Sequence, residues 1–110
     1  MENDIKNDKL VEMFKAISNI TRLEILQLLK EPEKNFPTQT HSKKEGLFVG
    51  GVCVSDIQNK IGLGQSTTSH YLSFLQQSGL LEMQRIGKWT YYRRNEKSIK
   101  QLERFLGGNL

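Results

Sequence analysis

The chain has 110 residues, of which 36% are hydrophobic and 25% charged, and its formal net charge at pH 7 is +4. This length suits one domain with one modest core, so we expect a single domain over residues 1–110. The sequence has no apolar run near the roughly 20 residues that span a bilayer, and it has a single cysteine. These features argue against membrane and disulfide-stapled secreted proteins, and we expect a cytoplasmic protein without membrane contact.

Two helices are predicted before residue 31. Between residues 8 and 18 apolar side chains recur at helical spacing, at Leu10, Val11, Phe14 and Ile17. Asn19 is a suitable N-cap for a second helix over residues 21–30. Apolar residues lie on more than one side of this second helix, which is typical of a helix in the middle of a core.

Residues 31–51 interrupt the helical pattern. This segment contains both prolines of the chain and three of its nine glycines. We predict a long loop insertion here, because the segment has no clear helical period and is rich in residues that break helices and strands. Loops of this length in compact domains are often either functional or disordered. Leu47, Phe48 and Val49 could either pair as a short strand or pack back onto the body, and the sequence leaves both open.

A helix-turn-helix is predicted over residues 54–78. Residues 54–61 and 65–78 read as two helices, and the Gly-Leu-Gly segment at 62–64 reads as the turn between them. Gly79 follows the second helix at the place where a left-handed residue commonly ends a helix. This compact pair is the most recognisable motif of the chain.

The second of these helices has two different faces. Thr68, Tyr71, Leu72 and Leu75 share one face at helical spacing and should anchor the helix inward. The other face carries small polar side chains, at Gln65, Ser66, Ser69, His70 and Ser73. Solvent-exposed helix faces usually carry Lys and Glu, which are better helix formers than Ser. A short, polar, nearly uncharged face can instead enter a DNA major groove and reach base edges and phosphates.

A basic hairpin is predicted after Gly79. Residues 83–94 carry four basic and no acidic residues, a charge equal to the net charge of the whole chain. Short runs rich in β-branched and aromatic residues flank Gly87 and Lys88, which we place at the hairpin tip. A last amphipathic helix is predicted over residues 96–106.

This order of elements predicts the fold class. We expect a mainly α protein with a small β-hairpin, in the order of four helices, the two strands of the hairpin and a last helix. A basic hairpin directly after a helix-turn-helix defines a winged helix-turn-helix, and its wing would place Arg85 and Lys88 against the DNA backbone.

Three stretches resemble the ArsR/SmtB family of winged-helix repressors. They are FKAISNITRLEILQLL (residues 14–29), VCVSDIQNKIGLGQSTTSHYLSFLQQSGLLE (52–82) and RIGKWTYYR (85–93). The resemblance covers about residues 10–106 apart from the insertion. It implies a homodimer, paired through the terminal helices (1–20 and 96–106), that binds a palindromic promoter operator on double-stranded DNA and represses transcription.

The predicted DNA-binding residues combine the helix face and the wing. His70 matches the DNA-reading histidine of the family. We expect Gln65, Ser66, Ser69, His70 and Ser73 to contact bases or phosphates, Thr67 to support the backbone contact, and Arg85 and Lys88 to bind phosphate.

The resemblance also directs attention to Cys53. Metal-sensing relatives carry two thiols two residues apart, and here Ser55 stands at the second thiol position; a serine hydroxyl is a poor ligand for a thiophilic metal. We therefore predict no metal site and no cofactor, and the inducer stays unknown. Apolar neighbours favour Cys53 as an inert packing residue. The alternatives are a one-cysteine redox switch and a hybrid metal site with His41 and Asp56 or Glu45.

A second class of function is a winged-helix module for protein interaction or RNA contact. Such a module would have no need of the polar outer face at residues 65–73. The sequence offers no nucleophile–base pair, phosphate loop or metal cluster, so we predict that the protein is not an enzyme.

Overall fold

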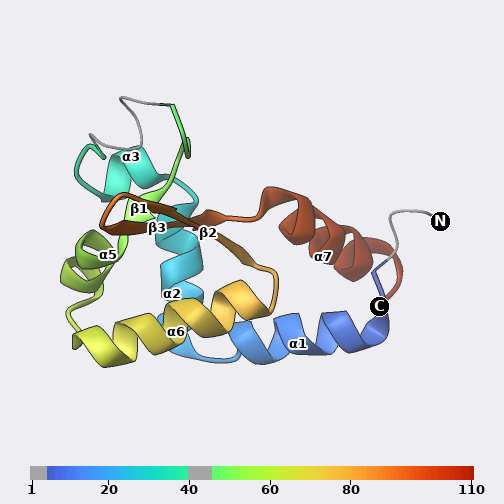
Figure 1. Ribbon diagram of the computed structural model, residues 1–110. Helices are drawn as coiled ribbons and strands as arrows, with labels where there is room; N and C mark the ends of the chain where they lie inside the picture. Colours follow the sequence, from blue (N-terminus) through green and yellow to red (C-terminus); the bar gives the residue numbers. More distant parts are fainter. Residues whose placement is uncertain (1–4, 40–45) are drawn as a thin grey trace.

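The helices surround a three-stranded antiparallel sheet (Figure 1). The computed structural model describes residues 5–39 and 46–110. Helix α6 lies along one side of the molecule, and α1 continues that side toward the C-terminal end (Figure 1). Helix α7 runs beside α1 at the end of the molecule opposite α5, so these two helices project from the body together (Figure 1).

Helices α1 (Asn7–Ile17) and α2 (Ile20–Leu29) form the N-terminal part, as the sequence predicts. The side chain of Asn19 accepts a hydrogen bond from the backbone N–H of Arg22 at 2.9 Å, which confirms Asn19 as the N-cap of α2. Helix α2 buries residues on more than one side and lies in the middle of the molecule (Figure 1).

The helix-turn-helix consists of α5 (Val54–Ile61) and α6 (Gln65–Gln77), within one residue of the predicted bounds. At the end of α6, Gly79 has a φ of +89°. Its N–H donates to the carbonyl of Gln76 at 3.0 Å, and the N–H of Leu80 donates to the carbonyl of Leu75 at 3.1 Å. These two bonds form a Schellman motif, which ends the helix where the sequence places its end.

The wing is a hairpin of β2 (Leu81–Ile86) and β3 (Trp89–Arg94), joined by Gly87 and Lys88. A two-residue strand that the sequence analysis did not predict, β1 (Val52–Cys53), pairs with β3 and completes the sheet order β1-β3-β2. The mainly α winged helix-turn-helix predicted from the sequence is confirmed. Burial in this sheet raises the pKa of the Tyr92 phenol.

The described parts of the insertion contain more structure than a plain loop. It begins with a short helix, α3 (Pro32–Asn35), in which Pro32 occupies the first turn. At the other end Phe48 is buried, whereas Leu47 and Val49 are exposed. Of the two options that the sequence left open, packing onto the body is therefore the one found, and it involves Phe48 alone.

Helix α7 (Glu96–Gly108) ends two residues later than predicted. The hydrophobic core joins side chains from all the main elements: Leu10, Met13, Ile25, Leu29, Val52, Ile57, Leu72, Leu75, Leu80, Leu81, Tyr92 and Leu102. No helix in the described ranges is long and apolar enough to cross a bilayer.

Candidate nucleic-acid interface

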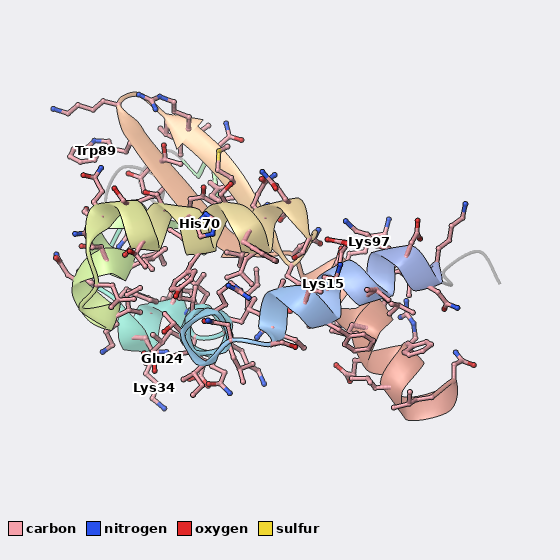
Figure 2. The ribbon with its side chains drawn as sticks, turned by 90° about the horizontal axis from the view of Figure 1, so that it is seen from below. Lys15, Glu24, Lys34, His70, Trp89 and Lys97 are labelled. Atoms are coloured by element: carbon pink, nitrogen blue, oxygen red, sulfur yellow. The ribbon has the colours of Figure 1, made fainter. Side chains whose placement is uncertain are left out.

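Helix α6 presents its small polar side chains outward. Three side chains of its predicted inner face are completely buried, namely Thr68, Leu72 and Leu75, and Tyr71 is half-buried. The opposite face is exposed at Gln65, Ser66, Thr67, Ser69 and His70, with Ser73 half-buried. Figure 2 looks onto this helix, with His70 near the middle of its length. The structure thus brings the predicted residues of this helix together on one surface.

The surface of α6 is free of full charges. Its 13 residues include no Asp, Glu, Lys or Arg. The N-cap is Gly64, which has no side chain to accept from the first turn. Because the first N–H groups of a helix have no partner within it, the amides of residues 65–67 remain available to an anion such as a phosphate.

His70 lies against two aromatic rings of the same helix. Its ring centroid is 6.2 Å from that of Tyr71 and 6.5 Å from that of Phe74, the second pair in an edge-to-face arrangement. These contacts limit the directions that the exposed imidazole can take. The imidazole can both donate and accept a hydrogen bond, as a base edge requires.

The structure divides the four basic residues of the wing into two pairs. Arg93 and Arg94, at the base, contact the carboxylates of Glu82 and Glu96, with N···O distances of 3.0 and 2.9 Å. Arg85 and Lys88 are exposed and form no ion pair with any residue in the described ranges. The sequence predicts these same two as phosphate ligands.

Lys88 occupies the hairpin turn. Its ammonium lies 5.3 Å from the ring centroid of Trp89, within the range of a cation–π contact. In Figure 2 the wing rises beside α6, with Trp89 near the outer end of the hairpin. The wing and the exposed face of α6 therefore lie next to each other on the same side of the molecule.

The surroundings of Cys53 are more polar than predicted. The thiol is half-buried and lies 3.3 Å from Oδ2 of Asp56 and 3.4 Å from Oγ of Ser55. Gln39, which the sequence analysis did not single out, donates to the same Asp56 oxygen at 2.8 Å and accepts from the Cys53 N–H at 3.0 Å. Gln39 lies in the insertion, far from Asp56 in the sequence, and no local pattern indicates this contact.

These groups line a small cavity of about 160 Å³, which also includes Trp89 and Tyr91 of the wing. No cluster of three or more metal-ligating side chains occurs within residues 5–39 and 46–110. His41 and Glu45, the other members of the hypothetical hybrid metal site, lie outside the described residues.

Comparison with known proteins identifies the family. Residues 49–83 match the model of a family described as "Bacterial regulatory protein, arsR family". Over 98 residues the chain is 48% identical to YbzH of Bacillus subtilis, an uncharacterized HTH-type transcriptional regulator, and the match covers 87% of this chain and 93% of YbzH. The chain belongs to the ArsR family.

Two further similar proteins extend the comparison. The arsenical resistance operon repressor of Escherichia coli is 31% identical over 83 residues, which are 76% of this chain and 56% of that repressor. The homodimeric winged helix-turn-helix DNA-binding domain of Mb0332 from Mycobacterium bovis is 27% identical, with a TM-score of 0.65, and the match covers 91% of this chain and 76% of that domain. This ArsR-family protein is thus a transcriptional regulator with a winged helix-turn-helix DNA-binding domain, and not an enzyme.

Proposed function

We propose that the protein is a homodimeric repressor that binds a palindromic promoter operator in the cytoplasm. Each subunit places its α6 in one of two successive major grooves, so the symmetry of the dimer matches that of the operator. The observation that carries the proposal is the outer face of α6, which is exposed, polar and without a full charge, beside a basic wing.

Helix α6 reads the bases. The side chains of Gln65, Ser66, Ser69, His70 and Ser73 contact base edges or phosphates, and Thr67 supports the backbone contact. Short polar side chains allow the helix to approach the groove floor, and the uncapped N-terminal amides favour a phosphate next to the first turn.

The wing supplies affinity that does not depend on sequence. Arg85 and Lys88 bind phosphates, and their charges are available because, among the residues that the structure describes, carboxylates pair with Arg93 and Arg94 but not with these two.

The dimer forms through α1 and α7, within a single domain of residues 1–110 that carries the 31–51 segment as an insertion. Phe14 of α1 and Phe105 of α7 lie 6.4 Å apart between ring centroids, so the two helices present a joint surface. Val11 of α1 and Leu106 of α7 are each 47% exposed, so both helices offer apolar area that a partner subunit can cover. The homodimeric state of the Mb0332 domain supports this assembly.

The repressor holds no metal through a thiol pair, because Ser55 occupies the place of the second thiol. Cys53 is a structural residue in this proposal. Its thiol is half-buried and donates to Oδ2 of Asp56 at 3.3 Å, so the side chain takes part in the local packing and hydrogen bonding at the start of α5.

The proposal is tested by fluorescence anisotropy of the protein titrated onto its own labelled promoter fragment, with random DNA of equal length as the control. We expect promoter binding at least tenfold tighter than random binding, with strong salt dependence, and sedimentation analysis should give a dimer.

Equal affinity for both fragments would contradict the repressor and favour a module for protein interaction. Selective binding of single-stranded RNA would favour the RNA alternative. A selective protein that stays monomeric on DNA would retain the DNA-binding part of the proposal and overturn the dimer.

A further inference from the structure

Arg22, in the first turn of α2, reaches back to the C-terminal end of α1. Its Nε donates to the carbonyl of Ala16 at 2.7 Å, and its Nη2 donates to the carbonyl of Lys15 at 3.1 Å. Both carbonyls belong to the last turn of α1, where helix geometry leaves oxygen atoms without intrahelical partners. The positive guanidinium therefore caps α1 at the end where the helix dipole favours a cation.

The same guanidinium contacts α6. Its central carbon lies 4.3 Å from the ring centroid of Phe74 and 5.5 Å from that of Tyr71. Both rings are half-buried, on the flank of α6 between its buried face and its exposed face. Since the N–H of Arg22 is itself held by Asn19, one residue joins α1, α2 and α6 through directional contacts.

The two aromatic rings that contact Arg22 also contact His70. Tyr71 and Phe74 are the two aromatic neighbours of that imidazole, at 6.2 and 6.5 Å. A continuous set of contacts therefore leads from the end of α1, through Arg22 and the two rings, to the exposed face of α6.

We infer that Arg22 is a positioning residue that fixes the recognition helix relative to α1. The inference rests on the proposed function, in which α1 belongs to the dimer interface and α6 lies in the groove. The orientation of α6 relative to α1 then sets the separation of the two recognition helices in the dimer. Arg22 thereby determines which spacing of operator half-sites the repressor accepts and how well His70 is aimed at its base.

The guanidinium is suited to this role in a way that an ammonium is not. Its planar group donates to two carbonyls in one direction while one flat face remains on the rings, whereas a lysine ammonium is a compact, strongly hydrated charge. The buried residues of α6 hold the helix onto the body, but they lie on its inner side. Contacts on the flank of α6, where Arg22 lies, oppose a rocking or rolling of α6 on its buried face.

The test uses Arg22→Lys in the full-length protein, with Ile25→Val as a control. Ile25 is completely buried in α2, so this control lowers stability without altering the contacts of Arg22. Binding is measured on the operator, on random DNA, and on operators with one base pair added or removed between the half-sites. Thermal unfolding measures the stability of both variants, so that their DNA binding is compared at a similar loss of stability.

We expect Arg22→Lys to lower the ratio of operator to random affinity roughly tenfold, which is within the range for one misplaced base contact. Random-DNA binding should change less than about twofold, because phosphate contacts tolerate a displaced helix. The penalty for a changed half-site spacing should shrink, whereas Ile25→Val should keep both the ratio and the spacing preference. Equal behaviour of the two variants would overturn the inference.

A double-mutant cycle with Phe74→Leu supplies a second, independent measurement. If Arg22 acts through the ring, the operator-to-random ratio of the double variant falls by less than the product of the single effects. Independent, multiplicative effects would overturn the inference, as would a Phe74→Leu protein with unchanged spacing preference. Failure of the proposed function is a distinct result, since it would show in the wild type as an absence of operator preference.

Discussion

Helix α6 and the wing, which we propose to be the two DNA-contacting parts, offer opposite chemistry. Helix α6 has 13 residues without a full charge and is held by completely buried side chains, a Schellman motif and the guanidinium of Arg22. The wing carries two exposed cations, Arg85 and Lys88, that form no ion pair with any residue the structure describes, on a hairpin whose outer part is mostly solvent-exposed. Selectivity needs a fixed position and short polar groups, whereas phosphate attraction needs only charge in the right region.

The largest effect is expected where α6 is anchored. Leu72→Ala removes a side chain with 0% exposure and should lower the free energy of unfolding by about 2–5 kcal/mol, because a cavity remains. Urea unfolding measures the change. The matched wing variant, Ile86→Ala, removes a half-buried side chain and should cost clearly less. Equal costs would show that the wing is as firmly packed as the helix.

The next effect concerns base reading by α6. His70→Ala should weaken operator binding by about 1–3 kcal/mol and random-DNA binding much less, if His70 contacts a base. Anisotropy titrations on both fragments give the two values. Gln77→Ala is the control, because Gln77 is exposed at the other end of the same helix. An equal loss on operator and random DNA would reject base reading by His70.

A smaller and less selective effect is expected in the wing. Lys88→Ala should weaken operator and random binding alike and reduce the slope of log K against log salt by about 0.9 unit, the value for one phosphate contact. The control is Lys34→Ala, since Lys34 lies on α3, away from the wing (Figure 2). A selective loss on the operator alone would assign Lys88 to base reading and weaken the contrast with α6.

The smallest effect is expected at Cys53. Cys53→Ser should change stability and operator affinity by about 0.5 kcal/mol or less, because serine keeps a polar atom beside Asp56. Neither zinc nor mild peroxide should release the wild-type protein from its operator. Release that disappears in Cys53→Ser would instead establish a one-cysteine sensor. Such a sensor would act on the wing, because Cys53 pairs with Tyr91 of β3.

The sequence was sufficient to predict those features of the fold that depend on residues close together in the chain. The ends of α5 and α6 follow from Gly62 and Gly79, both of which have a positive φ in the structure, and from helical spacing between them. The predicted inner face of α6 is confirmed by its burial. The hairpin tip at Gly87 and Lys88 follows from turn chemistry in the same way.

The sequence was insufficient where residues far apart meet. Strand β1 has only two residues, so it has no periodicity, and its pairing of Val52 with Tyr92 joins positions 40 residues apart. The contact of Gln39 with Asp56 also joins residues far apart in the sequence. So does the packing of Phe48 against Arg93, whose guanidinium lies 4.0 Å from the centroid of the Phe48 ring. Each depends on the route of the chain and not on neighbouring residues.

The sequence by itself determined the family resemblance, the helix-turn-helix and the residue types offered to DNA, because capping, turn chemistry and periodicity act within a few residues. Only the tertiary structure decided which charges remain available. Arg93 and Arg94 lie against carboxylates, while Arg85 and Lys88 contact no carboxylate within residues 5–39 and 46–110. It also decided that Arg22 joins three helices. Contacts of this kind arise when elements distant in sequence pack together, and no local pattern encodes them.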